Sequence, residues 1–367
     1  MSGQGPAYRR FMSDAISQHQ VTALIGRCYA GLDAASLRDE VLSRLRRIMT
    51  VDAAFFGTVD PQTLLFTSAA ADDPLRAATP LFLDNEYGRA DVNKFAALAE
   101  AADPVGSLDR ATRGQRAGSA RYREVMSPLG LGDELRAALV TGDACWGVLC
   151  LHREDAADGF GDREVDLIRR IAPHVAEGLR RAVTLGPVPV AAAGAVGPGM
   201  IVLDQDLAVM SLNAEAAQWL AEIDEADWPS GSELPMAVYA AAARLSGIEN
   251  GAPPPLSATV RLRSRSGRWL SLHASRLGGP PAPQVGVVIA PAPAAQVSSL
   301  LLSAYGLTRA QSRVVALVIK GRSTRQIVDE LHISAHTVQE HLTAAFDKLG
   351  VRSRRELVAT MLAGPPA

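Results

Sequence analysis

The sequence predicts a multidomain protein in which two α+β domains are followed by an all-α domain of four helices. Its 367 residues are too many for one ordinary hydrophobic core. Two segments, 186–198 and 291–299, are rich in Pro, Gly and Ala and lack apolar periodicity, so we expect them to be linkers. The expected parts are a polar tail at 1–20 and domains at 21–185, 199–290 and 300–367.

Charge is distributed unevenly along the chain. The whole sequence has a net charge of −2, but Leu307–Ala363 contains nine Lys and Arg against five Asp and Glu, a net charge of +4. A small basic module on an acidic body is typical of a DNA-binding domain joined to domains that do not bind DNA. Chance clustering of charge is the alternative explanation.

Cysteine usage and hydropathy predict a soluble, cytoplasmic protein. Cys28, Cys145 and Cys150 form no CxxC pair and have no metal-ligand spacing, and the polar first 20 residues do not resemble a signal peptide. Pro and Gly interrupt the longest weakly polar run, at 188–203, so we expect no membrane span. Cys145 and Cys150 lie five residues apart on one predicted strand, which should turn them to opposite faces.

The first domain is expected to begin with a helix capped by Ser36 and to end with a long helix from about Asp162. Strands are predicted at 53–59, 64–68, 134–141 and 145–152, the last two paired across Gly142-Asp143. The long helix carries a heptad-like seam of apolar residues, which could be either its core face or a dimer contact. The seam consists of Val165, Ile168, Ala172, Val175, Leu179 and Ala182.

This layout resembles a GAF domain, and the stretch GDREVDLIRRIAPHVAEGL is similar to that family's closing helix. The resemblance implies a sheet with a cavity beneath helices, where a small ligand can bind. Domains of this kind also serve as ligand-free scaffolds, and that alternative stays open.

The second domain is expected to be a sheet with short helices. Two strands flank a turn at 204–206, Asn213 caps a helix, and Leu270, Leu272 and Ala274 alternate with more polar residues. A final strand is predicted at 285–289. The segments MIVLDQDLAVMSLNAEAAQWL and SGRWLSLHASRL resemble a PAS domain, which implies the same choice between ligand sensor and scaffold.

In the third domain, the helix starts are marked by capping residues. Thr308 with Gln311, and Ser323 with Gln326, have capping-box spacing, and Ser334 and Ser353 are expected to cap two further helices. The helix after Ser334 has an apolar face of Val338, Leu342, Ala345 and Leu349 opposite a polar face. A short helix, a tight turn and a longer helix with a polar outer face form the helix-turn-helix that enters a major groove.

From Leu307 to Ala359 the sequence strongly resembles the LuxR-type (GerE-type) DNA-binding domain. The matching positions are Leu307-Thr308, Gly321, Ser323, Ile333-Ser334, Thr337-Val338, His341-Leu342 and Lys348-Leu349-Gly350-Val351. The chain departs from the family at Gln311 and Arg313, where acidic residues are usual, and at Gln339, where Lys is common.

The resemblance implies two sets of DNA contacts. Base edges are expected to face Gln339, Glu340, Thr343 and His336. Phosphates are expected to meet Thr324, Arg325, Thr337, Lys348 and Arg352. Each of these residues, taken singly, could also be an ordinary solvated side chain.

The sequence therefore predicts a one-component transcription regulator that binds double-stranded DNA as a homodimer. We expect a small-molecule ligand or a partner, bound at the first two domains, to control DNA binding. RNA polymerase is a further candidate partner. A ligand-free dimerisation or docking platform, or a redox sensor, is the alternative. No enzyme, metal or cofactor is predicted, because the sequence lacks a phosphate-binding glycine loop, a GxSxG motif and an HExxH motif.

Overall fold

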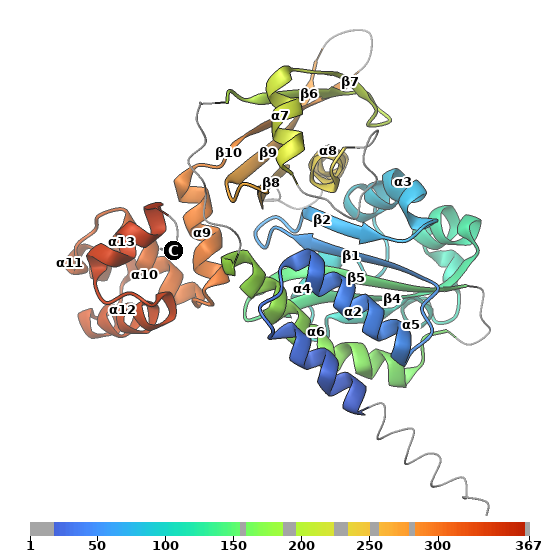
Figure 1. Cartoon of the computed structure of the whole chain (residues 1–367), viewed down its shortest axis with the longest axis horizontal. Helices are drawn as coiled ribbons and strands as arrows, with labels where there is room; N and C mark the ends of the chain where they lie inside the picture. The colour runs from blue at the N-terminus through green and yellow to red at the C-terminus, as the bar shows by residue number, and fades with distance from the viewer. Residues whose placement is uncertain are drawn as a thin grey trace, which may run out of the picture.

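The computed structural model describes residues 18–154, 159–185, 196–223, 234–249, 257–278 and 283–363. Figure 1 shows two bodies that each contain a sheet, with a helical body to one side. We call them the N-terminal domain (18–185), the middle domain (196–291) and the C-terminal domain (294–363). Of the polar tail expected at 1–20, residues 1–17 lie outside the described part of the chain. Residues 18–20 are helical and begin a helix that covers 18–28.

The N-terminal domain is built on an antiparallel sheet with the strand order β2-β1-β5-β4-β3. Its strands are β1 Ala53–Val59, β2 Phe66–Ala71, β3 Val105–Ser107, β4 Leu131–Thr141 and β5 Ala144–Glu154. The predicted hairpin is confirmed, because Thr141 pairs with Ala144 and Gly142 has the positive φ of 60° that such turns favour. The strand predicted from Leu64 starts later, since Leu64 itself has a left-handed φ of 56°.

One face of this sheet is covered by α2 (Ala34–Ile48) and α6 (Asp162–Leu185). Five of the six seam residues of α6 are buried in that core, at 1–2% exposure, and Ala182 is half-buried. The seam is therefore the core face of a single helix, and its alternative interpretation as a dimer contact is wrong. The cap of α2 is Asp33 rather than Ser36, because the Asp33 carboxylate accepts the Ser36 amide at 2.8 Å.

The opposite face is covered by short helical segments and loops. These segments are η1 Leu75–Ala78, α3 Thr79–Leu83, η2 Asp84–Gly88, α4 Phe95–Glu100, α5 Leu108–Ala111, η3 Arg116–Gly118, η4 Tyr122–Met126 and η5 Ser127–Leu129. Phe55 and Phe66 of the sheet pack here with ring centroids 5.2 Å apart, and Phe82 lies 5.0 Å from Phe55.

The expectation that Cys145 and Cys150 lie on opposite faces is wrong. Both pack into the same core as Val148, whereas Trp146 and Leu149 face the α2–α6 side. The cause is a register shift: Leu139 pairs with Gly147 but Val140 pairs with Cys145, so one extra residue reverses the alternation of β5. Both cysteines are free thiols.

The middle domain is a second antiparallel sheet with the order β7-β6-β10-β9-β8, so its strands are arranged as in the first sheet. Its elements are β6 Gly199–Leu203, β7 Val209–Leu212, α7 Ala214–Glu222, α8 Met236–Glu249, β8 Thr259–Arg263, β9 Trp269–Leu277 and β10 Gln284–Pro291. The predicted cap is confirmed, since Asn213 accepts the Ala216 amide at 2.9 Å. Leu270, Leu272 and Ala274 are buried as predicted.

Helix α8 packs the middle domain onto β2 and η2 of the N-terminal domain (Figure 1). At Gly247 the two backbones come so close that a Cβ would lie 2.0 Å from the carbonyl oxygen of Tyr87. Arg244 lies over the Tyr87 ring, 4.6 Å from its centroid, and donates to Thr63 O at 3.1 Å. The two sheet domains therefore share one continuous apolar core.

The C-terminal domain contains α9 Ala294–Ala304, α10 Arg309–Ile319, α11 Thr324–Leu331, α12 Ala335–Leu349 and α13 Arg354–Ala363. The linker predicted at 291–299 is helical from Ala294 onward, because its alanines favour a helix and Leu300, Leu301 and Leu302 anchor it in the core. Of the linker predicted at 186–198, only 196–198 are described.

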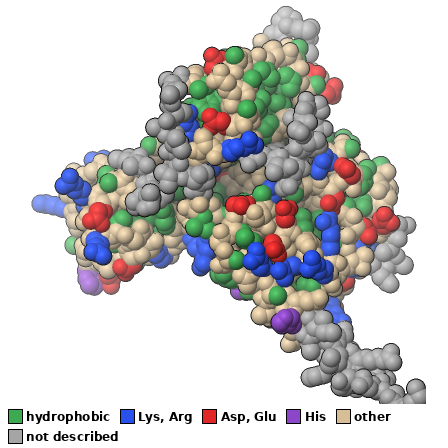
Figure 2. Space-filling view, in the orientation of Figure 1, with side chains coloured by type: hydrophobic (Ala, Val, Ile, Leu, Met, Phe, Trp, Pro, Cys, Tyr) green, Lys and Arg blue, Asp and Glu red, His purple; other side chains and the backbone are tan. Residues whose placement is uncertain are grey.

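Hydrophobic side chains gather on the visible face of the middle domain (Figure 2). Its exposed large apolar residues include Met200, Met210 and Leu212. Among the described helices, none has the length and apolarity needed to cross a bilayer.

Candidate nucleic-acid interface

The helix-turn-helix consists of α11 and α12. Ser323 starts α11 with a reciprocal capping box: its hydroxyl accepts the Gln326 amide, and the Gln326 side chain accepts the Ser323 amide at 2.8 Å. His332 ends the helix in the left-handed conformation with a φ of 54°, and Ser334 then caps α12. The tight turn predicted at His332-Ile333 is confirmed.

The inner face of α12 is anchored in the core of the C-terminal domain. Val338 and Ala345 are fully buried, and Leu342 and Leu349 are almost so. They pack with Val314 of α10, Ile327 of α11 and Leu357 of α13. This packing fixes the rotation of α12 about its own axis, and therefore which side chains face outward.

The four residues predicted to recognise bases lie on the exposed outer face of α12. Among the described residues, the side chains of Gln339 and Thr343 have no hydrogen-bond partner, so their polar groups are available to a ligand. Glu340 differs, because its carboxylate lies 3.4 Å from Nε2 of His336. An ion pair at this spacing exists only when the histidine is protonated.

The five residues predicted to meet phosphates are distributed around the ends of these helices. Thr324 and Arg325 begin α11, and Thr337 lies in the first turn of α12 with its hydroxyl 2.9 Å from that of Ser334. Arg352 precedes α13, and its amide donates to Glu356 at 2.8 Å. Exposed amides and positive dipole ends at helix N-termini favour anions, so the first turns of α11 and α12 suit phosphate oxygens.

Lys348 forms two hydrogen bonds within the C-terminal domain that could not be predicted from the sequence. Its Nζ donates to the Gly306 carbonyl at 2.8 Å and to Oε1 of Gln311 at 2.9 Å. Gln311 is the capping-box residue of α10 and one of the three positions at which the sequence departs from the family pattern. The lysine thus ties the end of α12 to the start of α10, and any phosphate contact must use its remaining N–H or compete with these bonds.

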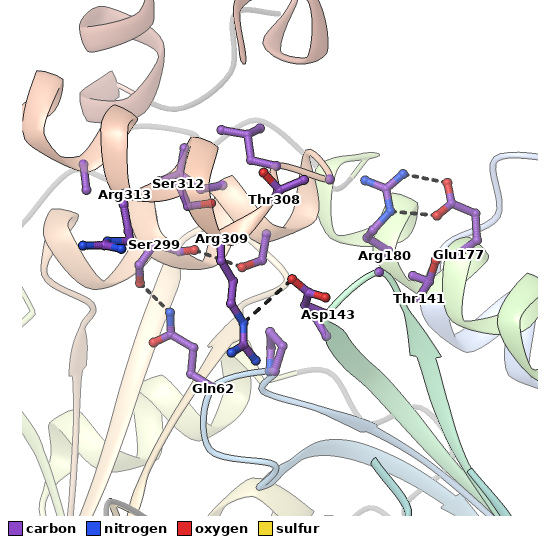
Figure 3. A pocket seen from close by; sticks show the side chains of 18 residues that line it. Gln62, Thr141, Asp143, Glu177, Arg180, Ser299, Thr308, Arg309, Ser312 and Arg313 are labelled. Atoms are coloured by element: carbon purple, nitrogen blue, oxygen red, sulfur yellow. Dashed lines mark hydrogen bonds and ion pairs between the residues drawn. The ribbon is translucent and has the colours of Figure 1, made fainter. Parts of the chain in front are cut away.

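The start of α10 faces the N-terminal domain across a groove of about 690 Å³ (Figure 3). Nε of Arg309 lies 3.8 Å from the carboxylate of Asp143 in the β4–β5 turn. Beside it, Gln62 donates to Ser299 of α9 at 2.9 Å, and Arg180 of α6 donates to the Ala304 carbonyl. These contacts involve α9 and α10 and leave the outer face of α12 exposed.

A buried polar cluster lies inside the N-terminal domain. Glu134, Cys150 and His152 place potential ligand atoms within 4.8 Å of one another. Arg121 donates to Oε2 of Glu134 at 2.7 Å, and Nε of Arg136 lies 3.7 Å from Oε1. Guanidinium charges thus occupy the surroundings that a metal cation would need, so the cluster is better described as an ion-pair network.

The pKa values in this cluster follow from burial and charge. Burial alone would raise the pKa of Glu134, but Arg121 and Arg136 lower it to about 2. Burial lowers the pKa of His152 to about 4 and raises that of Cys150 to about 12. The cluster therefore contains a carboxylate, a neutral imidazole and a thiol near neutral pH. A void of about 20 Å³ beside it has room for about one water molecule.

The fold and the exposed outer face of α12 define a helix-turn-helix protein of the DNA-binding class. Residues 306–361 match the family model described as bacterial regulatory proteins, luxR family, and residues 33–179 match the GAF domain model. The spore germination protein GerE of Bacillus subtilis (strain 168) is 38% identical over 56 residues, which span 76% of that protein and 15% of this chain. The chain belongs to the luxR family of bacterial regulatory proteins, with a GAF domain ahead of its DNA-binding domain.

Three solved structures have weaker similarity. The VqsR LBD domain from Pseudomonas aeruginosa is 16% identical, with a TM-score of 0.29, and the match covers 50% of this chain and 100% of that one. The E. coli DhaR(N)-DhaL complex is 12% identical, with a TM-score of 0.24 and coverage of 79% and 91%. The sensor region of a sensor histidine kinase is 15% identical, with a TM-score of 0.17 and coverage of 65% and 84%. These scores are low, so the family assignment rests on the sequence matches.

Proposed function

We propose that this protein is a one-component transcription regulator that recognises its DNA site through the outer face of α12. The observation that carries the proposal is that α12 has two distinct faces. Its apolar face is buried in the core, and its other face exposes Gln339, Glu340 and Thr343. Gln can form two hydrogen bonds to adenine, and Glu can accept one from cytosine. His336 lies one turn before Glu340 and serves as a fourth base contact.

Phosphate contacts from Thr324, Arg325, Thr337, Lys348 and Arg352 would fix the orientation of α12 in the groove. Two of these residues lie in the first turn of α11, two lie in the first and last turns of α12, and Arg352 follows α12; together they contribute three positive charges. Backbone contacts of this kind supply affinity and position, whereas base contacts supply specificity. A homodimer would present two copies of α12 to half-sites about one DNA turn apart.

Control of DNA binding is assigned to the two sheet domains, with the middle domain as a PAS-like unit. Its strand order, which equals that of the GAF domain, and its Asn213-capped helix support this interpretation. A scaffold role is the second candidate for the GAF domain, and its interior favours that role. Ion pairs and aromatic rings fill the space above its sheet, and the void there has room for only about one water molecule.

Selection of bound duplexes from a random DNA pool tests the proposal with the full chain. We expect one enriched, pseudo-palindromic sequence, and we expect the fragment 293–367, which keeps α9, to select the same half-site. Absence of affinity for any duplex at low ionic strength, in a chain with a folded circular dichroism spectrum, would contradict the regulator function.

A further inference from the structure

Helix α9 is shared between two hydrophobic cores. The Ala304 side chain, 1% exposed, packs into the core that α2 and α6 form on the first sheet. Leu302 packs instead with Leu307 in the core of the C-terminal domain. The Ser298 hydroxyl also donates to the Met361 carbonyl of α13 at 3.0 Å. Contacts that orient α9 on the GAF domain therefore orient the whole C-terminal domain.

Arg180 of α6 binds the C-terminal end of α9. Its guanidinium donates to the Ala304 carbonyl and lies against Gly306, where an added Cβ would be 3.3 Å from Nη1. The last carbonyls of a helix have no backbone donor within it, and the helix dipole favours a cation at that end. Two hydrogen bonds to the Glu177 carboxylate, at 2.6 and 2.8 Å, hold the guanidinium in place (Figure 3). The Arg180 side chain is only 18% exposed, so water competes little for these bonds.

Two further side chains hold α9 nearer its start. Gln62 of the GAF domain donates to the Ser299 hydroxyl at 2.9 Å. Arg261 of the middle domain donates from Nη1 to the Gln296 carbonyl at 2.8 Å. The sheet domains thus hold the C-terminal domain along the length of its first helix, whereas a flexible tether would hold it at one point only.

This attachment fixes the orientation of α12 relative to the sheet domains. In a homodimer joined through those domains, it also fixes the distance and rotation between the two copies of α12. We propose that Arg180, together with Gln62, is a positioning residue for DNA recognition: by holding α9 on the GAF domain, it determines the spacing between the two half-sites. This inference rests on the proposed function, because it requires that α12 reads DNA in a dimer.

Rigid and loose attachment differ in the half-site spacings that they accept. One extra base pair moves a half-site by about 3.4 Å along the DNA axis and by about one tenth of a turn around it. Two rigidly placed helices can engage both half-sites at one spacing only. Two loosely tethered helices engage both sites over a range of spacings, because the tether gives a similar effective concentration at each.

Fluorescence anisotropy with a series of duplexes tests the proposal on the full chain. The duplexes carry the selected half-sites with the spacer shortened or lengthened by up to about five base pairs, half a turn. We expect the affinity of the wild type to fall about tenfold or more when the spacer changes by one or two base pairs. In the double variant Gln62→Ala/Arg180→Met the fall should be less than about threefold.

Arg181→Met is the matched control. It removes the same charge one residue further along α6, but Arg181 contacts Glu177 and the Tyr29 ring, both in the GAF domain. This variant should keep the spacing preference of the wild type. Arg180→Lys, which keeps a cationic donor, should restore most of the preference in the presence of Gln62. Affinity for a duplex with a single half-site should be equal in all variants, which separates loose attachment from misfolding.

Two results would overturn the proposal. The first is equal affinity of the wild type for every spacer length, which needs no variant to fold. The second is a strict spacing preference in the double variant, because it would show that the two C-terminal domains are joined directly to each other. Both results leave the regulator function intact, whereas a wild-type chain that binds no duplex contradicts that function itself.

Discussion

Asp60 and Arg261 lie 201 residues apart in the sequence and form a buried, two-point ion pair between the GAF domain and the middle domain. Nε of Arg261 donates to Oδ2 of Asp60 at 2.8 Å, and Nη2 donates to Oδ1 at 2.5 Å. The Arg261 amide also donates to Oδ2, at 3.0 Å. With Nη1 on the Gln296 carbonyl, this arginine holds all three domains together.

Asp60→Asn should destabilise the full chain by about 3–5 kcal/mol, because it leaves the Arg261 cation buried without its counter-charge. Urea unfolding followed by circular dichroism measures the change. The matched control is Asp143→Asn, because Asp143 is 64% exposed and 3.8 Å from Arg309. That variant should change stability by less than about 1 kcal/mol. If the two substitutions lower the free energy of unfolding equally, the buried ion pair does not stabilise the protein more than the exposed one.

His152 should make the GAF domain sensitive to acid. Its pKa is about 4 in the folded protein against an ordinary 6.5, because burial disfavours the imidazolium. Between pH 6.5 and 4 the unfolded chain takes up a proton that the folded chain does not, so the free energy of unfolding falls as pH falls. The full contribution by linkage is about 3 kcal/mol.

Urea unfolding at a series of pH values from 7 to 4 measures this effect. His152→Leu should lose less stability than the wild type over this range, whereas His19→Leu, at an exposed position, should follow the wild type. A parallel pH dependence of wild type and His152→Leu would show that the imidazole is not the sensitive group.

Gln339→Ala should remove discrimination at one base position by about 1–3 kcal/mol, because a two-point contact to a base edge is lost. Competition binding with single-base variants of the selected site measures this. Affinity for the other positions should change little. If the variant distinguishes every operator variant as the parent does, Gln339 does not contact a base.

Lys348→Met should weaken binding evenly across DNA sequences and lower the slope of log affinity against log salt by about one. The same change removes the hydrogen bonds to Gly306 and Gln311, so thermal unfolding of the C-terminal domain should shift downward as well. Gln311→Ala is the matched control, since it disturbs the same junction without removing a charge. A base-selective loss of affinity for Lys348→Met would contradict the phosphate role.

The helices of the C-terminal domain could be predicted closely because their start signals are local. Thr308, Ser323 and Ser334 each accept the amide three residues later, and two of the three caps are reciprocal with a glutamine. The same holds for Asn213 in the middle domain. The outer face of α12 followed from the spacing of its apolar residues, which fixes the rotation of the helix.

Features that depend on contacts between distant segments could not be predicted in this way. The faces of Cys145 and Cys150 depend on a bulge that arises from the pairing of β5 with β4. Helix α9 was mistaken for a linker because its Ala-rich start has no apolar period of its own. The partners of Lys348 and the pair formed by Asp60 and Arg261 arise only when the folded chain brings remote residues together.

Strand order also determines when each sheet can be completed during synthesis. β5 and β10 are the last strands of their sheets in the chain, yet each occupies the centre of its sheet. In the folded sheet, β10 lies between β6 and β9 and pairs with both. Until residue 291 has left the ribosome, β6 and β9 each have one edge without a hydrogen-bonded partner strand. A chain truncated before Gln284 would therefore be prone to aggregation, and expression boundaries for the two sheet domains should extend beyond Pro291.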